Sequence, residues 1–172
     1  DDYEENRHFL MGQYFKNNYN TAMRQLPIVN SLVQIQRIEV WITNRTGATT
    51  DARDIVGLAD LGEIQPANNG VTPLTNDAKP DNGTNNLFTN VKNYRAPSQV
   101  TSQLQGLGLR PVKKKKKTYA RKLTTNEYYF NPQIGFMSIN TQLQPDEVLA
   151  VAYQYTYNGK VYQVGEFSQD IA

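Results

Sequence analysis

His8 is the only histidine of the chain, and there is no cysteine. A Ser-His-Asp arrangement for nucleophilic catalysis would therefore have to use His8, and a Cys-His pair is excluded. The Gly-x-Ser-x-Gly motif, which presents a nucleophilic serine in many hydrolases, does not occur. We interpret His8 as a structural residue.

Carboxylates are spread along the chain and form close pairs in three places. A glycosidase needs two carboxylates that face each other across a cleft. Nothing in the spacing selects one pair for this role, and the pair after Pro145 is typical of a turn before a strand. We therefore predict that the chain is not an enzyme. The three pairs are Asp51 with Asp54, Asp60 with Glu63, and Asp146 with Glu147.

Oxygen ligands that Ca²⁺ could use gather between residues 77 and 85. Their spacing does not match an EF-hand loop, and a segment rich in Asn and Asp is usually an ordinary loop. Gly106-Leu107-Gly108 is too short for a dinucleotide fingerprint. We predict no bound metal and no cofactor. The oxygen-bearing residues are Asp77, Asp81, Asn82 and Asn85.

Five consecutive lysines form the strongest charge feature. Such a run could bind phosphate groups of a nucleic acid or a lipid. Tyr119 is the one aromatic residue close to it, whereas binding of a single strand by stacking needs several. The net charge of +2 gives no general attraction to nucleic acid, and we predict no nucleic-acid partner. An anion-binding run and a solvated loop remain as interpretations of Lys113, Lys114, Lys115, Lys116 and Lys117.

A tyrosine-rich hairpin is the clearest local element. Asn158-Gly159 separates two strand-like segments, and a type I′ turn needs positive φ at both of its central positions. The turn sets the register, so that Tyr155 faces Tyr162. Aligned aromatic rings can stack on sugars as in a carbohydrate-binding module, or they can contact the core or another domain, which we favour. The candidate interaction face contains Tyr153, Tyr155, Tyr157 and Tyr162.

Hydrophobic periodicity predicts the elements that position these residues. Helices are expected over residues 14–26 and 87–94, the second capped by Thr84, and from Pro97 to Gly106. A long surface loop is expected over residues 62–86, and Thr50-Asp51 could cap a short turn. Strands are expected at 35–43, 55–61, 119–123, 127–131, 136–140, 148–157 and 160–167. Within the first strand, Ile38, Val40 and Ile42 point to one face, whereas Arg37, Glu39, Trp41 and Thr43 point to the other.

Length and composition place these elements in one domain, residues 1–172, with a variable loop and short-helix region at 64–118. The abrupt start suggests a segment excised from a longer protein. No apolar run is long enough for a membrane helix, so we expect a segment that does not span a membrane. The predicted fold is mainly β with flanking helices (α+β). We expect an antiparallel β-sandwich, jelly-roll-like or galactose-binding-like.

Several stretches, from "ENRHFL" at Glu5 to "DEVLAVAYQYTYNGKVYQVGEF" at Asp146, resemble the SprA/Sov family of Bacteroidetes, which are gliding-motility proteins and outer-membrane translocons of the type IX secretion system. The resemblance runs from one end of the chain to the other and is least evident over residues 64–118. The most specific stretches are "RIEVWITN" from Arg37 and "DEVLAVAYQYTYNGKVYQVGEF" from Asp146. The others begin at Glu5 ("ENRHFL"), Tyr14 ("YFKNNY"), Asp54 ("DIVGLADLGE") and Asn131 ("NPQIG").

The resemblance implies a non-catalytic structural and interaction domain of the translocon, supporting protein secretion and gliding motility. It implies a location associated with the outer membrane, and it carries over no catalytic residue. Expected partners are other domains of the same translocon, type IX secretion subunits or cargo proteins. A surface carbohydrate-binding β-sandwich module is the alternative, with the hairpin tyrosines as its binding face.

Overall fold

The computed structural model describes residues 7–24, 32–43, 52–67, 70–109 and 119–171, and its strands form two antiparallel sheets. The larger sheet contains, in spatial order, β3 (Ala52–Asp54), β4 (Tyr119–Lys122), β2 (Val33–Thr43), β7 (Leu149–Tyr157) and β8 (Lys160–Val164). The smaller contains β1 (His8–Leu10), β6 (Phe136–Ile139) and β5 (Tyr128–Asn131). The predicted mainly β, antiparallel class is confirmed. Its jelly-roll-like or galactose-binding-like description stays a prediction, and Lys113 to Lys117 and Thr50-Asp51 lie outside the described residues.

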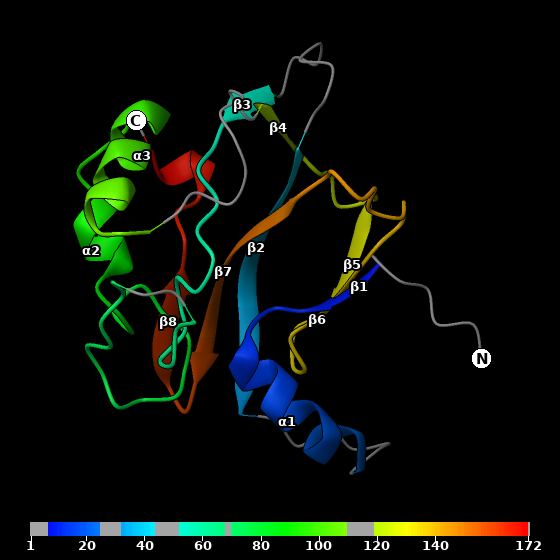
Figure 1. Cartoon of the computed structure of the whole chain (residues 1–172). Coiled ribbons are helices and arrows are strands. Elements are labelled where there is room, and N and C mark those ends of the chain that lie inside the picture. The colour runs from blue at the N-terminus through cyan, green and yellow to red at the C-terminus, as the bar shows by residue number, and fades with distance from the viewer. Residues whose placement is uncertain (1–6, 25–31, 44–51, 68–69, 110–118, 172) are drawn as a thin grey trace.

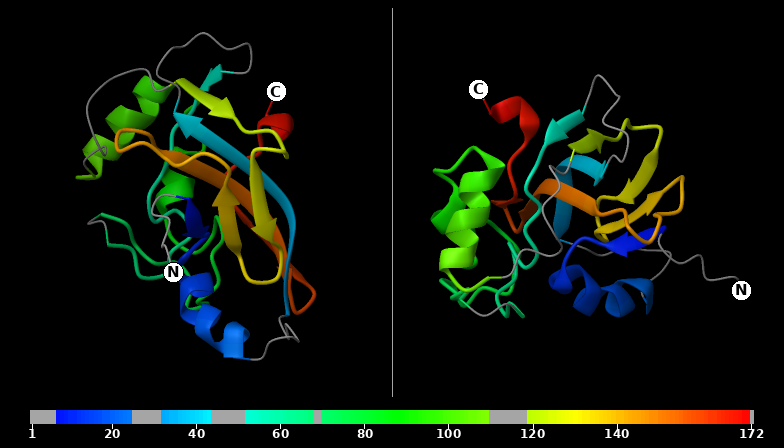
Figure 2. Two further views of the ribbon diagram at one scale, coloured as in Figure 1. Left: turned by 90° about the vertical axis from the view of Figure 1, so that its right-hand side faces the viewer. Right: turned by 45° about the horizontal axis from the view of Figure 1, so that its top comes forward.

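The larger sheet separates two layers (Figure 1). The helices α2 (Leu87–Val91) and α3 (Pro97–Gly106) lie on one side of it, and the smaller sheet lies on the other (Figure 2). The helix α1 (Gln13–Arg24) lies beside the smaller sheet, at the end of β2 where that strand begins. The short helix η1 (Ser168–Asp170) follows β8 on the side of α3.

The pair β2 and β7 forms the centre of the larger sheet, with nine registered residue pairs from Val33↔Tyr157 to Ile42↔Leu149. A bulge between Ile35 and Arg37 shifts the register, so that Ile35 joins the same side of the sheet as Ile38. Alternation along the rest of β2 puts Val40 between the two sheets, where it is fully buried. The predicted two-faced pattern of this strand is therefore confirmed, but both of its faces are covered.

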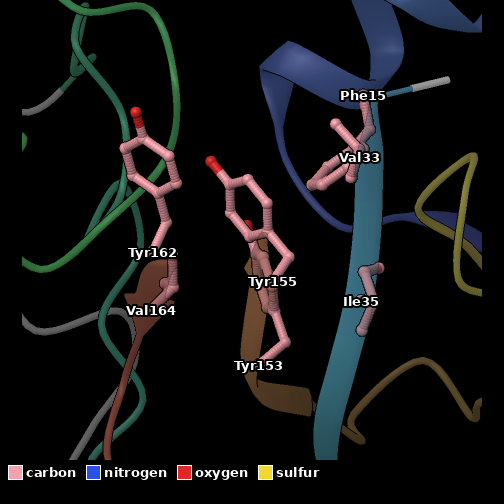
Figure 3. Close-up of a cluster of buried hydrophobic side chains, with 7 residues drawn as sticks. All are labelled: Phe15, Val33, Ile35, Tyr153, Tyr155, Tyr162 and Val164. Carbon is pink, nitrogen blue, oxygen red and sulfur yellow. The ribbon is translucent and has the colours of Figure 1, made fainter. Parts of the chain in front are cut away.

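Two hydrophobic clusters fill the space on the side of the larger sheet that faces α1 and the smaller sheet. The first packs Phe15 of α1 against Tyr153 and Tyr155 of β7, and Tyr162 of β8 stacks on Tyr155 (Figure 3). The second joins Val40 to Met137 and Ile139 of the smaller sheet. A third, separate cluster takes its four buried members from α2 and α3: Leu87, Val91, Val100 and Leu104.

The predicted strand at residues 55–61 is wrong. Residues 55–58 have no regular structure and residues 59–62 form turns, since Asp60 adopts the left-handed conformation with φ 63°. Leu58 and Leu61 pack against the cluster of α2 and α3 instead of alternating across a sheet. The prediction also missed β1 and β3, because three residues are too few to show a period of two.

The predicted loop at residues 62–86 is irregular, as expected, but its end is not at the surface. Thr84 and Asn85 are 1% and 0% exposed. Thr84 does not cap α2 as predicted, because its hydroxyl donates to the carbonyl of Lys79. The N-cap position is occupied by Asn86, and the Asn85 side chain accepts from the backbone N–H of Leu87 at 2.9 Å.

The hairpin of β7 and β8 has the predicted register, with Tyr155 opposite Tyr162 and Tyr157 opposite Lys160. Its turn residues have positive φ, 48° at Asn158 and 78° at Gly159. A Cβ added to Gly159 would meet no atom within 4 Å, so the cost of a substitution there is conformational strain alone.

We expect Gly159→Ala to lower the free energy of unfolding by about 1 kcal/mol, because a left-handed conformation is costly for residues with a Cβ. Urea unfolding followed by circular dichroism measures this difference. Gly106→Ala is the control, since Gly106 is helical and also has open space around it; alanine there should be neutral or stabilising by up to about 1 kcal/mol. Equal stability of Gly159→Ala and the unsubstituted chain would contradict the type I′ turn.

Among the described residues, no helix has the length and apolar character needed to cross a membrane.

Candidate interaction groove

One edge of β7 is paired along only part of its length. The ladder between β7 and β8 ends at Tyr153↔Val164, because β8 stops there and Gly165, which packs on Ala152, has a left-handed φ of 80° instead of strand geometry. The first part of β7, from Leu149 to Ala152, is therefore paired with β2 on one side and with no strand on the other.

The unpaired side of β7 presents backbone hydrogen-bonding groups. The N–H of Thr43 donates to the carbonyl of Val148 at 3.0 Å, which fixes the alternation of the ladder with β2. Val148 and every second residue after it direct their backbone groups to β2, so Leu149 and Val151 direct theirs to the opposite edge. Within the part of the chain that the structure describes, those groups of Leu149 and Val151 make no hydrogen bond.

A pocket of about 500 Å³ lies at this edge. Its walls come from three places that are distant in sequence: Leu149 and Val151 of β7, Phe9 and Met137 of the smaller sheet, and the turn at residues 58–63. The volume is within the usual range for ligand sites, roughly 300–1,000 Å³. The pocket is an open groove between the two sheets, and most of its wall is apolar.

Among the described residues, the charged groups at the groove are all acidic. Asp60, Glu63 and Glu147 line it, and no Lys, Arg or His of the described ranges does so. Glu63 accepts a hydrogen bond from the N–H of Gln13 at the start of α1, at 3.0 Å, and Glu147 accepts one from the N–H of Gln144, at 2.9 Å. These bonds fix the positions of two of the carboxylates, and the resulting field favours a cationic partner.

The predicted tyrosine face is buried. Tyr153, Tyr155 and Tyr162 are 2%, 0% and 5% exposed and belong to the first cluster (Figure 3). Tyr157 is half-buried. Burial raises the pKa of the hydroxyls of Tyr153 and Tyr155, so both stay neutral hydrogen-bond donors at physiological pH. The rings that suggested sugar stacking therefore form core, as we favoured from the sequence.

The tyrosine hydroxyls tie distant segments to the hairpin. Tyr153 donates to the carbonyl of Met11 at 2.9 Å, and Tyr155 donates to the carbonyl of Pro80 at 3.0 Å. Tyr162 donates to the Asp77 carboxylate at 3.2 Å. The first of these bonds holds the chain between β1 and α1 at the end of the groove, where Met11 and Tyr153 are both lining residues.

Asp77, one of the predicted calcium ligands, is paired with Lys79 at 2.8 Å. The hydrogen bond from Lys79 lowers the pKa of the Asp77 carboxyl, although burial acts in the opposite direction. The Lys79 ammonium also lies 4.5 Å from the centroid of the Tyr157 ring. Asp77 thus stabilises the hairpin end as part of a charged network.

Stability should depend on pH through Asp77. Because the pKa of Asp77 is lower in the folded chain than its ordinary value, the ionised carboxylate stabilises the fold at pH values above the usual carboxyl pKa of about 3.9. This stabilisation is lost as the pH falls through the lowered pKa. We expect Asp77→Asn to reduce the free energy of unfolding by about 0.5–1 kcal/mol at pH 7, and by progressively less in acid. Urea titrations across this pH range test it, with Asp54→Asn as an exposed control. An Asp77→Asn effect that is constant with pH would contradict the assignment.

The other predicted calcium ligands also make structural hydrogen bonds. Asn85 donates to the carbonyls of Asp60 and Glu63, at 2.7 and 3.0 Å, and so shapes the acidic turn of the groove. The side chain of Asn82 accepts from the N–H of Gly165 at 2.8 Å, just after the end of β8. Asp81 accepts from the backbone N–H of Gly83. Among the described residues, no three His, Cys, Asp or Glu side chains gather closely enough to hold a metal ion.

The remaining predicted residues do not meet in one place. His8 is exposed, shares a hydrogen bond with Ser138 at 2.7 Å and stacks on Phe136. Asp54 ends β3 as an exposed residue, Asp146 is exposed in a turn, and Asp51 lies outside the described residues. Of the carboxylate pairs, Asp60 with Glu63 is the one whose two members both line the groove.

Sequence reasoning missed a buried carboxylate on the other face of β2. Glu39 is 4% exposed, and it accepts hydrogen bonds from the Trp41 indole at 2.7 Å and from the backbone N–H of Ser168 at 3.1 Å. The guanidinium of Arg37 lies 4.0 Å from the ring centroid of Phe167 and pairs with Asp170 at 3.1 Å. The signal was the charge alternation of β2, but the segment that covers it lies about 130 residues away.

No protein-family model matches this chain, and the comparison with curated proteins finds no match.

Proposed function

We propose that the chain is a non-catalytic structural and interaction domain of an outer-membrane translocon of the type IX secretion system, supporting protein secretion and gliding motility. One observation carries the proposal beyond the resemblance itself. The two stretches most specific to the SprA/Sov family fall on β2 and on the β7–β8 hairpin, that is, on the two central strands of the larger sheet and the edge strand beside them.

The distribution of the resemblance supports the same proposal. Residues 64–118, where it is least evident, contribute α2 and α3, whose four buried members form a cluster of their own. The two helices can therefore vary among relatives without altering the clusters that join the sheets, whereas Asp77 and Pro80 of the same segment bind the hydroxyls of Tyr162 and Tyr155 in the first cluster. A shared sheet with a variable appendage is what a structural domain of one family would contain.

As part of a translocon, the domain would act through its shape and surface. The two packed sheets provide a rigid body, and the groove beside Leu149 and Val151 offers a place for a partner. The partners we propose are other domains of the same translocon, type IX secretion subunits or cargo proteins, at the outer membrane.

The test uses the whole protein that carries this chain, in its own type IX-competent bacterium. Tagged protein is purified from outer membranes and the co-purified proteins are identified by mass spectrometry, while cargo secretion and gliding are scored in a strain without the gene. We expect type IX subunits in the purified material and loss of both activities in the strain. Normal secretion and gliding, together with no type IX subunit recovered, would refute the proposal.

A second strain shows whether the fold of this segment matters. It carries Glu39→Ala, which disrupts a buried contact, and is compared with Asp54→Asn at an exposed site. A structural domain predicts impaired secretion at reduced protein levels for the first change and normal behaviour for the second.

A further inference from the structure

We infer that the groove binds an extended peptide segment of a partner protein, which adds as a strand to the free edge of β7 at Leu149 and Val151 and carries basic residues beside alternating apolar ones. The inference rests on the proposed function only in treating the chain as an interaction domain. The purified chain is sufficient to test it.

The backbone of β7 provides the first argument. Backbone N–H and C=O groups that are withdrawn from water are almost always hydrogen-bonded, and the edge groups of Leu149 and Val151, two half-buried residues, are unpaired among the described residues. The unpaired N–H and C=O groups belong to every second residue along one edge of β7, and a neighbouring strand would provide hydrogen-bond partners at that spacing. A small apolar molecule could fill the groove but would leave these groups unpaired.

The walls of the groove provide the second argument. A strand beside β7 would direct every second side chain to the same face as Leu149 and Val151, toward Phe9 and Met137 of the smaller sheet. Those side chains would enter an apolar space of about 500 Å³. Strand addition to an exposed edge commonly combines such backbone pairing with pockets for alternate side chains.

Charge provides the third argument and selects among strands. Of the residues that the structure describes, three carboxylates and no basic side chain line the groove, so a strand flanked by Lys or Arg is favoured over an acidic one. Asp60 and Glu63 belong to the turn at residues 58–63 and Glu147 comes just before β7, so the carboxylates line two different walls of the groove.

The first experiment measures the backbone groups directly. Amide hydrogen exchange is followed by NMR with and without the synthetic peptide Lys-Val-Thr-Val-Thr-Val-Lys, blocked at both ends. We expect the amides of Leu149 and Val151 to exchange faster than those of Ala150 and Ala152 in the free chain, and to slow by about tenfold when the peptide is bound. Protection of both amides in the free chain, or no change up to millimolar peptide, would overturn the inference.

Matched peptides and variants test the recognition chemistry by fluorescence anisotropy. We expect a peptide with Glu in place of Lys, or with Pro in place of the central Val, to bind at least about tenfold more weakly. Leu149→Pro removes an unpaired N–H at the first position of β7, and Val161→Pro, at an exposed position on the outer edge of β8, is its control. We expect binding to be lost in the first and kept in the second.

A charge variant covers the case in which a proline variant fails to fold. Asp60→Asn with Glu147→Gln should weaken binding by about fivefold and reduce its salt dependence. Equal binding of the Lys and Glu peptides, or binding that this charge variant leaves unchanged, would overturn the basic-strand inference. Sedimentation without peptide tests the rival occupant, a second copy of the chain. A dimer in which the same two amides are protected would overturn the inference in favour of self-association.

The outcomes separate this inference from the proposed function. Peptide binding in a chain whose loss leaves secretion intact would refute the translocon assignment alone. Failure of the peptide to bind, with type IX subunits recovered from the membrane, would refute strand addition alone.

Discussion

Replacing Glu39 with alanine is expected to lower the free energy of unfolding by about 3–5 kcal/mol, the usual cost of removing one partner from a buried charged network. Glu39 accepts from the Trp41 indole, from the backbone N–H of Ser168 and from the Ser168 hydroxyl, at 2.7 to 3.2 Å. The ammonium of Lys122 lies 3.4 Å from the same carboxylate. Alanine would leave these donors without their acceptor, and two of them belong to a segment that the carboxylate holds against β2.

The segment after β8 should respond most strongly. Residues 166–171 are held to β2 by Glu39 and by the ion pair of Arg37 with Asp170, and to the helical side by Arg95 with Glu166 at 2.6 Å. The ion pairs include exposed partners and contribute little by themselves. In Glu39→Ala, we therefore expect faster amide exchange in this segment as well as the global loss of stability.

Thermal and urea unfolding measure the loss, and Glu39→Gln is the matched control. Glutamine keeps the shape and one acceptor oxygen, so we expect it to cost about 1–3 kcal/mol, less than alanine. If Glu39→Ala were as stable as the unsubstituted chain, the carboxylate would not be what secures the C-terminal segment.

Gly135→Ala is the second substitution with a large expected effect, and it should lower the free energy of unfolding by about 3 kcal/mol. Gly135 has a φ of 72°, which costs about 1–2 kcal/mol for a residue with a Cβ. The added Cβ would also overlap the Phe15 ring at Cδ1, Cγ and Cε1, and such overpacking costs about 1–3 kcal/mol more. Phe15 is 2% exposed at the centre of the first cluster, so its ring has little room to move.

A double-mutant cycle separates the two causes. Gly159→Ala has a similar φ with open space around it and so measures the strain alone. Phe15→Leu, measured alone and combined with Gly135→Ala in urea unfolding, should show a favourable coupling of about 1 kcal/mol or more, because the smaller side chain relieves the overlap. Additive effects of Gly135→Ala and Phe15→Leu would contradict the close packing of the Phe15 ring on Gly135.

Local signals predicted much of the larger sheet. The register of the β7–β8 hairpin followed from Asn158-Gly159, because a two-residue turn fixes its flanking pairs without help from the rest of the chain. The opening of α3 at Pro97 and most strand positions followed from equally local rules. The strand predicted at residues 55–61 was wrong because that prediction also relied on local signals alone. Their apolar content is real, but Leu58 and Leu61 pack on helices that only the folded chain brings near.

The groove could not be predicted in this way. The groove exists because β7 begins at Leu149, whereas its pairing with β8 covers only the part of β7 from Tyr153 onward. Its other walls are formed by β1 and the turn at residues 58–63. These parts are separated by up to about 140 residues, and no periodicity records which edge of a strand stays unpaired.

The amino-acid order alone thus specifies the class of fold, the hairpin and its register, and the burial preference of the tyrosines, since these follow from backbone preferences and from the period of apolar residues. The covering of Glu39 by Ser168, the joining of Asn85 to Asp60 and Glu63, and the open edge at Leu149 and Val151 arise only when distant segments pack together. The first two features depend on hydrogen bonds between residues more than twenty positions apart, and the third depends on which edge of β7 its neighbouring strands leave unpaired. Such long-range relations produce no local pattern in the amino-acid sequence.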